Sequence, residues 1–293
     1  MSNTQTLIGS IAILISVGAL SLSDAIIKSQ GVTLPLWQLL LVRSALTLPL
    51  LLVVATLRGS LLPINLIWVA VRSVLLVVMW LCYYAALPHM PLSLAAAALY
   101  AGPIFIVVLV HLAERRWPSH RVLGAVLLGF VGVALAIGPD VSAIGPMVLL
   151  PVAAAALYAM AMVVTSTRCK GEDPVTLVLF LNMSLVVAGA GLGVFGAPIA
   201  PGAAWVAPDG PMLLILSLLA ALMLIGAGGA AVAYQWGPPA IIATLDYSYL
   251  VFSVVWDLLF FAAFPTPIAL TGVAMIICAG LLALASPKRQ AEA

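Results

Sequence analysis

Long apolar runs, separated by short polar or Pro- and Gly-rich breaks, dominate the pattern of this chain. A helix needs roughly 20 apolar residues to cross the hydrocarbon core of a membrane. The runs are continuous rather than alternating, and lipid excludes open sheets, so each run predicts a transmembrane helix. The ten expected helices cover residues 6–28, 35–57, 66–87, 91–113, 121–138, 144–166, 174–196, 211–235, 239–263 and 267–285.

Composition leads to the same class of protein. Of 293 residues, 65% are hydrophobic and only 7% are charged, which is too little charge for the surface of a soluble globule. We therefore expect an all-α integral membrane protein. Cys82, Cys169 and Cys278 have no paired spacing, so neither a disulfide framework nor a zinc site is indicated. The first run lacks a basic leader and a cleavage pattern, which predicts a retained helix rather than a signal peptide.

The basic residues predict the orientation in the membrane. With a cytoplasmic N-terminus, Lys28 alone falls in an outer loop, and all the other loop and tail lysines and arginines fall inside. Both termini are therefore expected in the cytoplasm. The inner basic residues are Arg58, Arg115, Arg116, Arg121, Arg168, Lys170, Lys288 and Arg289.

An internal repeat divides the predicted helices into two halves, 1–140 and 141–293. Each half holds five helices, an odd number, so the second copy must enter the membrane upside down. Inverted repeats of this kind are common in secondary transporters, whose sites lie between the repeats. The alternative is chance, because the chain is rich in both residue types that match. At an offset of 148, the residues Pro91, Gly124, Gly132 and Pro139 meet Pro239, Gly272, Gly280 and Pro287, and the short hairpins 87–91 and 236–239 join equivalent helices.

Two aspartates within the run 239–263 are the strongest functional signal. Asp246 and Asp257 are eleven residues apart, which places them on nearly the same helix face, with Tyr249 and Ser253 between them. A charge in the bilayer is costly unless it faces a cavity or a partner, so this face should look toward a substrate pathway. The alternative is a pair of aspartates that only packs helices together.

The other charged residues within the runs form two pairs by their expected depth in the membrane. Asp24 and Arg43 are expected near the outer surface, and Arg72 and Asp246 in the inner half, as gates or substrate anchors. Alternatively, opposite charges at one depth simply neutralise each other, which suits Asp24 and Arg43 best. Asp257 has no basic residue at its depth other than those that Asp24 occupies, so we expect it to bind and release the proton of a coupled cycle.

Tyrosines inside the spans suit a planar or zwitterionic organic substrate, because each combines a flat apolar face with a hydroxyl. Many aromatic residues in membrane helices serve packing alone, and Tyr100 and Tyr158, in alanine-rich helices, are the best candidates for contact with a ligand. Small residues at 226–231 favour close helix packing over a moving hinge. The tyrosines are Tyr83, Tyr84, Tyr100, Tyr158, Tyr247 and Tyr249.

The order and spacing of short motifs resemble the drug/metabolite transporter superfamily, specifically its bacterial EamA type, over essentially the whole chain. The resemblance implies ten helices in two inverted five-helix repeats. One position departs from it, since the counterpart of Glu114 is Ala262 and a role that needs two symmetric glutamates is in doubt. The motifs are Ser23-Asp24-Ala25 with Lys28, Pro35-Leu36-Trp37-Gln38 leading to Arg43, Tyr83-Tyr84-Ala85-Ala86-Leu87 followed by Pro91-Leu92, Tyr100, Pro103, Glu114-Arg115, Leu157-Tyr158-Ala159, and 243–249.

The function that the resemblance implies is secondary active transport of small organic metabolites across the bacterial inner membrane by alternating access. Its substrates would be amino acids, riboflavin-like aromatics, S-adenosylmethionine-like cations or amphiphilic drugs. We expect no cofactor, metal or nucleic acid, only a small-molecule substrate and the lipid bilayer. The runs 121–138 and 267–285, without internal charge, are candidates for scaffold or homodimer contacts.

An enzyme is the alternative from a different class. The chain has no His-Glu-x-x-His zinc pattern, no Gly-x-Ser-x-Gly elbow and no phosphate-binding Gly-x-x-x-x-Gly-Lys loop, which speaks against catalysis and ATP-driven pumping. A membrane enzyme that uses Asp24, Asp246 or Asp257 as acid and base would need two carboxyl groups around one water.

Overall fold

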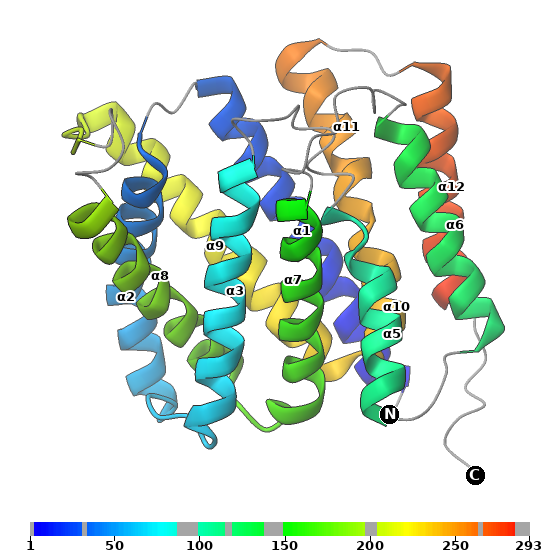
Figure 1. Cartoon of the computed structure of the whole chain (residues 1–293), viewed down its shortest axis with the longest axis horizontal. Helices are drawn as coiled ribbons and strands as arrows, with labels where there is room; N and C mark the ends of the chain where they lie inside the picture. The colour runs from blue at the N-terminus through cyan, green and yellow to red at the C-terminus, as the bar shows by residue number, and fades with distance from the viewer. Residues whose placement is uncertain are drawn as a thin grey trace.

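The computed structural model describes residues 3–30, 34–86, 99–114, 119–137, 149–196, 204–262 and 266–284, and all regular structure in these ranges is helical. The helices run roughly side by side in one bundle (Figure 1). Their bounds are α1 (Asn3–Gln30), α2 (Leu36–Arg58), α3 (Leu66–Ala86), α5 (Gly102–Glu114), α6 (His120–Ile137), α7 (Leu149–Arg168), α8 (Pro174–Gly196), α9 (Gly210–Trp236), α10 (Pro239–Asp246), α11 (Ser248–Phe261) and α12 (Pro267–Leu284).

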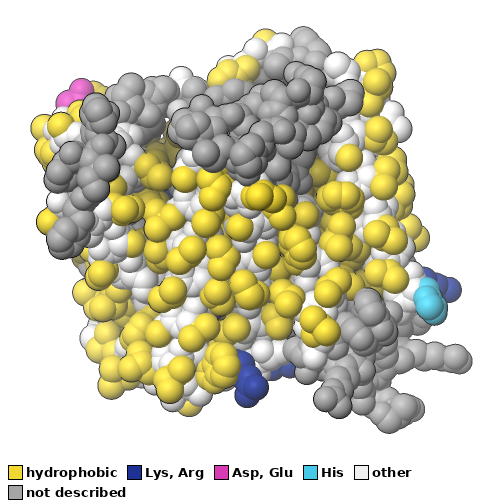
Figure 2. All heavy atoms as spheres, in the orientation of Figure 1, with side chains coloured by type: hydrophobic (Ala, Val, Ile, Leu, Met, Phe, Trp, Pro, Cys, Tyr) yellow, Lys and Arg dark blue, Asp and Glu magenta, His cyan; other side chains and the backbone are white. Residues whose placement is uncertain are grey.

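The described helices lie close to the runs expected from the apolar pattern. Seven helical stretches are long and apolar enough to cross a membrane, and 120–135 and 270–283 form shorter apolar helices. Figure 2 shows a surface covered by hydrophobic side chains, with basic side chains toward its lower edge. These features are consistent with a multi-pass membrane protein. The hairpin at 87–91 and the first residues of the run 91–113 lie outside the described residues.

One expected helix is interrupted. The run 239–263 forms α10 and α11, because the regular hydrogen-bond pattern breaks at Tyr247, whose backbone stays near helical values (φ −57°, ψ −20°). The Tyr247 side chain is fully buried and fills the space beside Gly129 of α6, where a Cβ atom would collide with its ring. The prediction of a single regular helix was wrong at this residue.

Close packing of small residues joins helices that are far apart in the sequence. The main pairs are α1 with α9, α2 with α8, α3 with α7, and α6 with α12. A Cβ atom on Gly229 of α9 would lie 2.8 Å from the Ala12 carbonyl oxygen of α1, and one on Gly189 of α8 would lie 2.8 Å from the Trp37 carbonyl oxygen of α2. The expected packing role of 226–231 is therefore confirmed for Gly229, whose backbone meets α1 directly.

Hydrogen bonds tie two connections together at one end of the bundle, the lower end in Figure 1. Glu172, between α7 and α8, accepts hydrogen bonds from the backbone N–H groups of Ile64 (2.9 Å) and Asn65 (2.6 Å) before α3. The Gln235 side chain, from the end of α9, donates to the carbonyl oxygens of Cys169 (2.6 Å) and Glu172 (2.9 Å). We call these five residues the clasp. It fixes the ends of α3, α7, α8 and α9 relative to one another.

Candidate functional site

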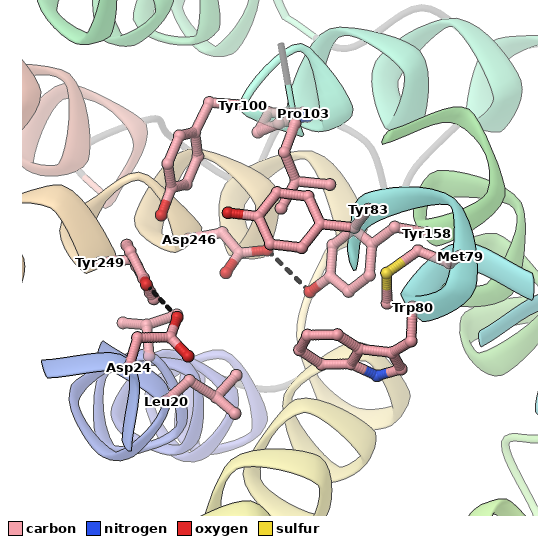
Figure 3. A pocket seen from close by; sticks show the side chains of 12 residues that line it. Leu20, Asp24, Met79, Trp80, Tyr83, Tyr100, Pro103, Tyr158, Asp246 and Tyr249 are labelled. Carbon is pink, nitrogen blue, oxygen red and sulfur yellow. Dashed lines mark hydrogen bonds between the residues drawn. The ribbon is translucent and has the colours of Figure 1, made fainter. Parts of the chain in front are cut away.

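A cavity lies among α1, α3, α5, α7, α10 and α11 (Figure 3). On α3 its lining residues Met79, Trp80 and Tyr83 lie in the half of the helix away from the clasp. The space between its lining atoms amounts to about 780 Å³, the part open to solvent included. We call it the acid pocket. Its lining residues are Val17, Leu20, Asp24, Met79, Trp80, Tyr83, Leu99, Tyr100, Pro103, Tyr158, Asp246 and Tyr249.

Asp246, the last residue of α10, is held by tyrosines from two other helices. Its Oδ2 atom accepts hydrogen bonds from the hydroxyl groups of Tyr158 on α7 (2.8 Å) and Tyr234 on α9 (3.3 Å). The rings of these tyrosines meet edge to face, with centroids 6.4 Å apart. Among the described residues, no hydrogen-bond donor meets the Oδ1 atom, so this oxygen is available to a ligand in the pocket.

Asp24 on α1 is held in a similar way. The Tyr249 hydroxyl of α11 donates a hydrogen bond to its Oδ2 atom, and the indole N–H of Trp256, also on α11, donates to Ser21 of α1 (2.9 Å). These two contacts fasten α1 to α11 beside the pocket. Within the described part of the chain, the Oδ1 atom of Asp24 meets no donor either.

Aromatic rings form the rest of the wall. The rings of Trp80 and Tyr83 on α3 meet edge to face with centroids 6.5 Å apart. The ring centroids of Tyr100 and Tyr249 are 5.6 Å apart. Figure 3 shows Tyr83 and Tyr100 directed toward the space above the two aspartates. A flat apolar ligand can stack on such walls while its polar edge reaches the carboxylates.

The expected ion pair between Arg72 and Asp246 is wrong. Arg72 is fully buried, and it donates to the Thr165 hydroxyl of α7 (2.8 Å) and to the Leu177 carbonyl oxygen of α8 (3.3 Å). The hydrogen bonds of Arg72 and Asp246 lead to different partners. Arg72 therefore joins α3 to α7 and α8, while Asp246 binds tyrosines.

Arg43 on α2 is buried as well, with its guanidinium carbon 5.9 Å from the centroid of the Trp80 ring. Its Nε and Nη2 atoms have no acceptor among the described residues. Arg43 makes no ion pair with Asp24. Among the described residues, Arg58 at the end of α2 and Asp173 just before α8 form an ion pair at 3.9 Å.

Two other predicted residues, Ser253 and Tyr247, do not line the pocket. The Ser253 hydroxyl donates to the Tyr249 carbonyl oxygen of its own helix (3.0 Å), and Tyr247 is buried against α6. The side chains of Tyr84, Glu114 and Asp257 lie outside what the structure describes. The polar face expected from Asp246 to Asp257 thus contributes Asp246 and Tyr249 to the pocket.

Two contributors were not predicted from the sequence. Trp80 lies three residues before Tyr83 on α3, a spacing that places both on one helix face and that offered a usable signal. Tyr234 lies on α9, and nothing in its spacing points to Asp246. Only the way in which α9 crosses α7 and α10 brings its hydroxyl to the carboxylate.

Comparison with known proteins gives the fold first. No family model matches the chain. A solved crystal structure of a protein that carries no functional name superposes with a TM-score of 0.80, covers 97% of this chain and 97% of its own, and is 20% identical. At that identity the likeness shows the fold alone.

Sequence relatives point to transport. The chain is 26% identical over 210 residues to a riboflavin transporter of Rhizobium johnstonii (71% of this chain, 67% of the relative). It is 27% identical over 199 residues to a riboflavin transporter of Brucella anthropi (67% and 68%), and 24% identical over 204 residues to an uncharacterized transporter of Helicobacter pylori (69% and 68%). These relatives support a multi-pass membrane transporter of small metabolites rather than an enzyme.

Proposed function

We propose that this chain is a secondary transporter of small organic metabolites that works by alternating access between two inverted five-helix halves, 1–140 and 141–293. The observation that carries the proposal is the acid pocket, which is lined by α1, α3 and α5 of one half and by α7, α10 and α11 of the other. The contact between Asp24 and Tyr249 crosses from one half to the other. A substrate bound there would touch both halves.

The pattern of helix packing supports two related halves. If α1, α2, α3, α5 and α6 correspond to α7, α8, α9, the α10–α11 pair and α12, exchanging the halves turns the α1–α9 contact into the α7–α3 contact. The α2–α8 and α6–α12 contacts map onto themselves, and α1–α11 maps onto α7–α5. Corresponding helices also run in opposite directions in Figure 1, as an inverted repeat requires.

The charge distribution supports an orientation in the bacterial inner membrane. Arg58, Arg168 and Lys170 lie next to the clasp, and basic residues of short loops favour the cytoplasmic side. The clasp would then close the cytoplasmic end, and the acid pocket would lie nearer the periplasm. Both termini would be cytoplasmic.

The proposal is tested by counterflow in proteoliposomes that contain the purified protein. A panel of labelled riboflavin, amino acids and organic cations is offered against the same unlabelled compound inside the vesicles. We expect saturable, competable accumulation of at least one compound, above the level in protein-free vesicles. No accumulation of any of them, or chemical conversion without movement, would contradict the proposal, and conversion would favour an enzyme.

A further inference from the structure

We propose that the acid pocket selects flat aromatic substrates that present hydrogen-bond donors or a positive charge to Asp246 and Asp24, and that it rejects the same ring systems when they carry an anionic group. This inference rests on the proposed transport function and names the substrate class of the same site.

Each of the two aspartates in the pocket has one carboxylate oxygen that accepts no hydrogen bond from the described residues. In both aspartates the Oδ2 atom is used by tyrosine hydroxyls, whereas no donor among the described residues reaches Oδ1. An ionised carboxylate only accepts hydrogen bonds, so each Oδ1 atom calls for a donor from a ligand. The donors that match are N–H groups, hydroxyl groups and protonated amines.

Aromatic side chains form part of the pocket wall. Trp80, Tyr83 and Tyr100 line the pocket together with the two aspartates (Figure 3). Aromatic side chains bind flat rings by stacking and bind cations through their π-faces. A planar molecule with donors along one edge satisfies both the walls and the carboxylates.

The charge of the pocket lining disfavours anionic ligands. The described residues that line the pocket include two aspartates and no lysine, arginine or histidine. Arg43 lies near Trp80 but is not part of the lining, and Arg72 is turned toward Thr165 and the Leu177 carbonyl oxygen. An anion in the pocket would meet two carboxylates in a poorly screened environment and would find no cationic side chain on the wall.

The two aspartates are not equivalent. Asp246 accepts hydrogen bonds from two tyrosine hydroxyls, those of Tyr158 and Tyr234, whereas Asp24 accepts one, from Tyr249. Asp246 thus joins the pocket to both α7 and α9, and it is the aspartate that the test replaces.

The test compares three flat tricyclic compounds in proteoliposomes: riboflavin, which is neutral and rich in donors, riboflavin 5′-phosphate, which adds a dianion to the same ring, and the cation proflavine. We expect riboflavin or proflavine to be taken up at least about 30-fold faster than the phosphate, the scale of a lost charge-assisted hydrogen bond. In Asp246→Asn, uptake of the preferred compound should fall and the preference over the phosphate should narrow. Asp173→Asn, which removes a carboxylate far from the pocket, should keep the parent's preference.

Uptake of the phosphate at the rate of riboflavin, or an unchanged preference in Asp246→Asn, would overturn the inference. If the protein moves amino acids but none of the three flat compounds, the inference fails and the transport function stands. If it moves nothing in either panel, both fail.

Discussion

Two carboxylates, the buried Glu172 in the clasp and the half-buried Asp246 in the acid pocket, are held in contrasting ways. Glu172 is only 6% exposed, and both of its oxygens accept backbone N–H groups of another connection. Asp246 has one oxygen bound by two tyrosines and the other without a donor among the described residues. A carboxylate whose acceptors are all filled by the protein stabilises the fold, and one with an acceptor left open toward a cavity is placed for a ligand.

The contrast extends to the two ends of the bundle. At the clasp, two side chains, those of Glu172 and Gln235, join neighbouring connections, and nearby on α8 the Thr176 hydroxyl donates to the Ser60 carbonyl oxygen (2.6 Å). The acid pocket, by contrast, lies among α1, α3, α5, α7, α10 and α11 and holds half-buried aspartates. Under the proposed alternating access this asymmetry would reverse, and the clasp would break when the pocket opens toward the clasp end of the bundle.

The largest effect is expected from Asp246→Asn. The substitution keeps the size of the side chain but replaces an acceptor-only carboxylate with a neutral amide, so transport should fall by about 10- to 100-fold, the scale of a hydrogen bond to a charged group. Initial rates in proteoliposomes at equal protein content measure the loss. Unchanged transport would show that Asp246 does not bind the substrate.

A control keeps this result separate from folding. Asp173→Asn alters an exposed ion pair with Arg58 at 3.9 Å, and such pairs contribute about 1 kcal/mol or less. Its transport should equal that of the parent. Matching elution profiles and melting temperatures for both variants would show that the loss in Asp246→Asn comes from the pocket.

The next effect tests the packing of α9 against α1. Gly229→Ala places a methyl group 2.8 Å from the Ala12 carbonyl oxygen and 2.9 Å from the Ser16 Cβ atom, so the helices must separate, at a cost of about 1–3 kcal/mol. Thermal unfolding in detergent should show a clearly lower melting temperature. The neighbouring Gly228→Ala places its Cβ atom 3.9 Å from the Val178 Cγ2 atom, an ordinary contact, and should be neutral or stabilising, by up to about 1 kcal/mol. Equal melting temperatures would contradict the close contact.

A smaller effect is expected from Glu172→Gln. The amide keeps one acceptor, but its NH₂ group faces a backbone N–H of Ile64 or Asn65, which leaves that donor unsatisfied at a cost of about 1–2 kcal/mol. Thermal unfolding measures the loss, and Asp173→Asn again serves as the matched control. A Glu172→Gln protein as stable as Asp173→Asn would mean that the clasp does not hold this end closed.

The helices were predictable because the hydropathy of each run can be read directly from its own residues. The run 239–263 was recognised, but its break at Tyr247 was not, and the run itself carries no sign of the contact that Tyr247 makes beside Gly129 of another helix. The common depth of Arg72 and Asp246 stays a prediction. Which helix each side chain faces depends on how the helices cross, so the sequence alone suggested an ion pair where the structure has two separate sets of partners.

In the candidate site, too, the residues themselves could be predicted but some of their contacts could not. Asp246, Asp24, Tyr83, Tyr100, Tyr158 and Tyr249 were singled out because polar and aromatic residues in a membrane span are unusual, and all six line the pocket. Their roles in binding stay a prediction. The Tyr234 contact could not be predicted, because a tyrosine near the end of α9 carries no sign of which residue its hydroxyl will reach.

The proposed alternating access, under which ligand binding at Asp246 would be coupled to opening of the clasp, can be tested directly at Cys169. This thiol is fully buried, and burial raises its pKa to about 11, so alkylation by a maleimide at neutral pH should be slow, because the thiolate is the reactive form. The measurement uses a protein with Cys82→Ser and Cys278→Ser, with and without a saturating transported substrate. The account predicts that substrate accelerates alkylation of Cys169 and that Asp246→Asn removes the acceleration. A rate that ignores substrate, or that rises equally in Asp246→Asn, would contradict it.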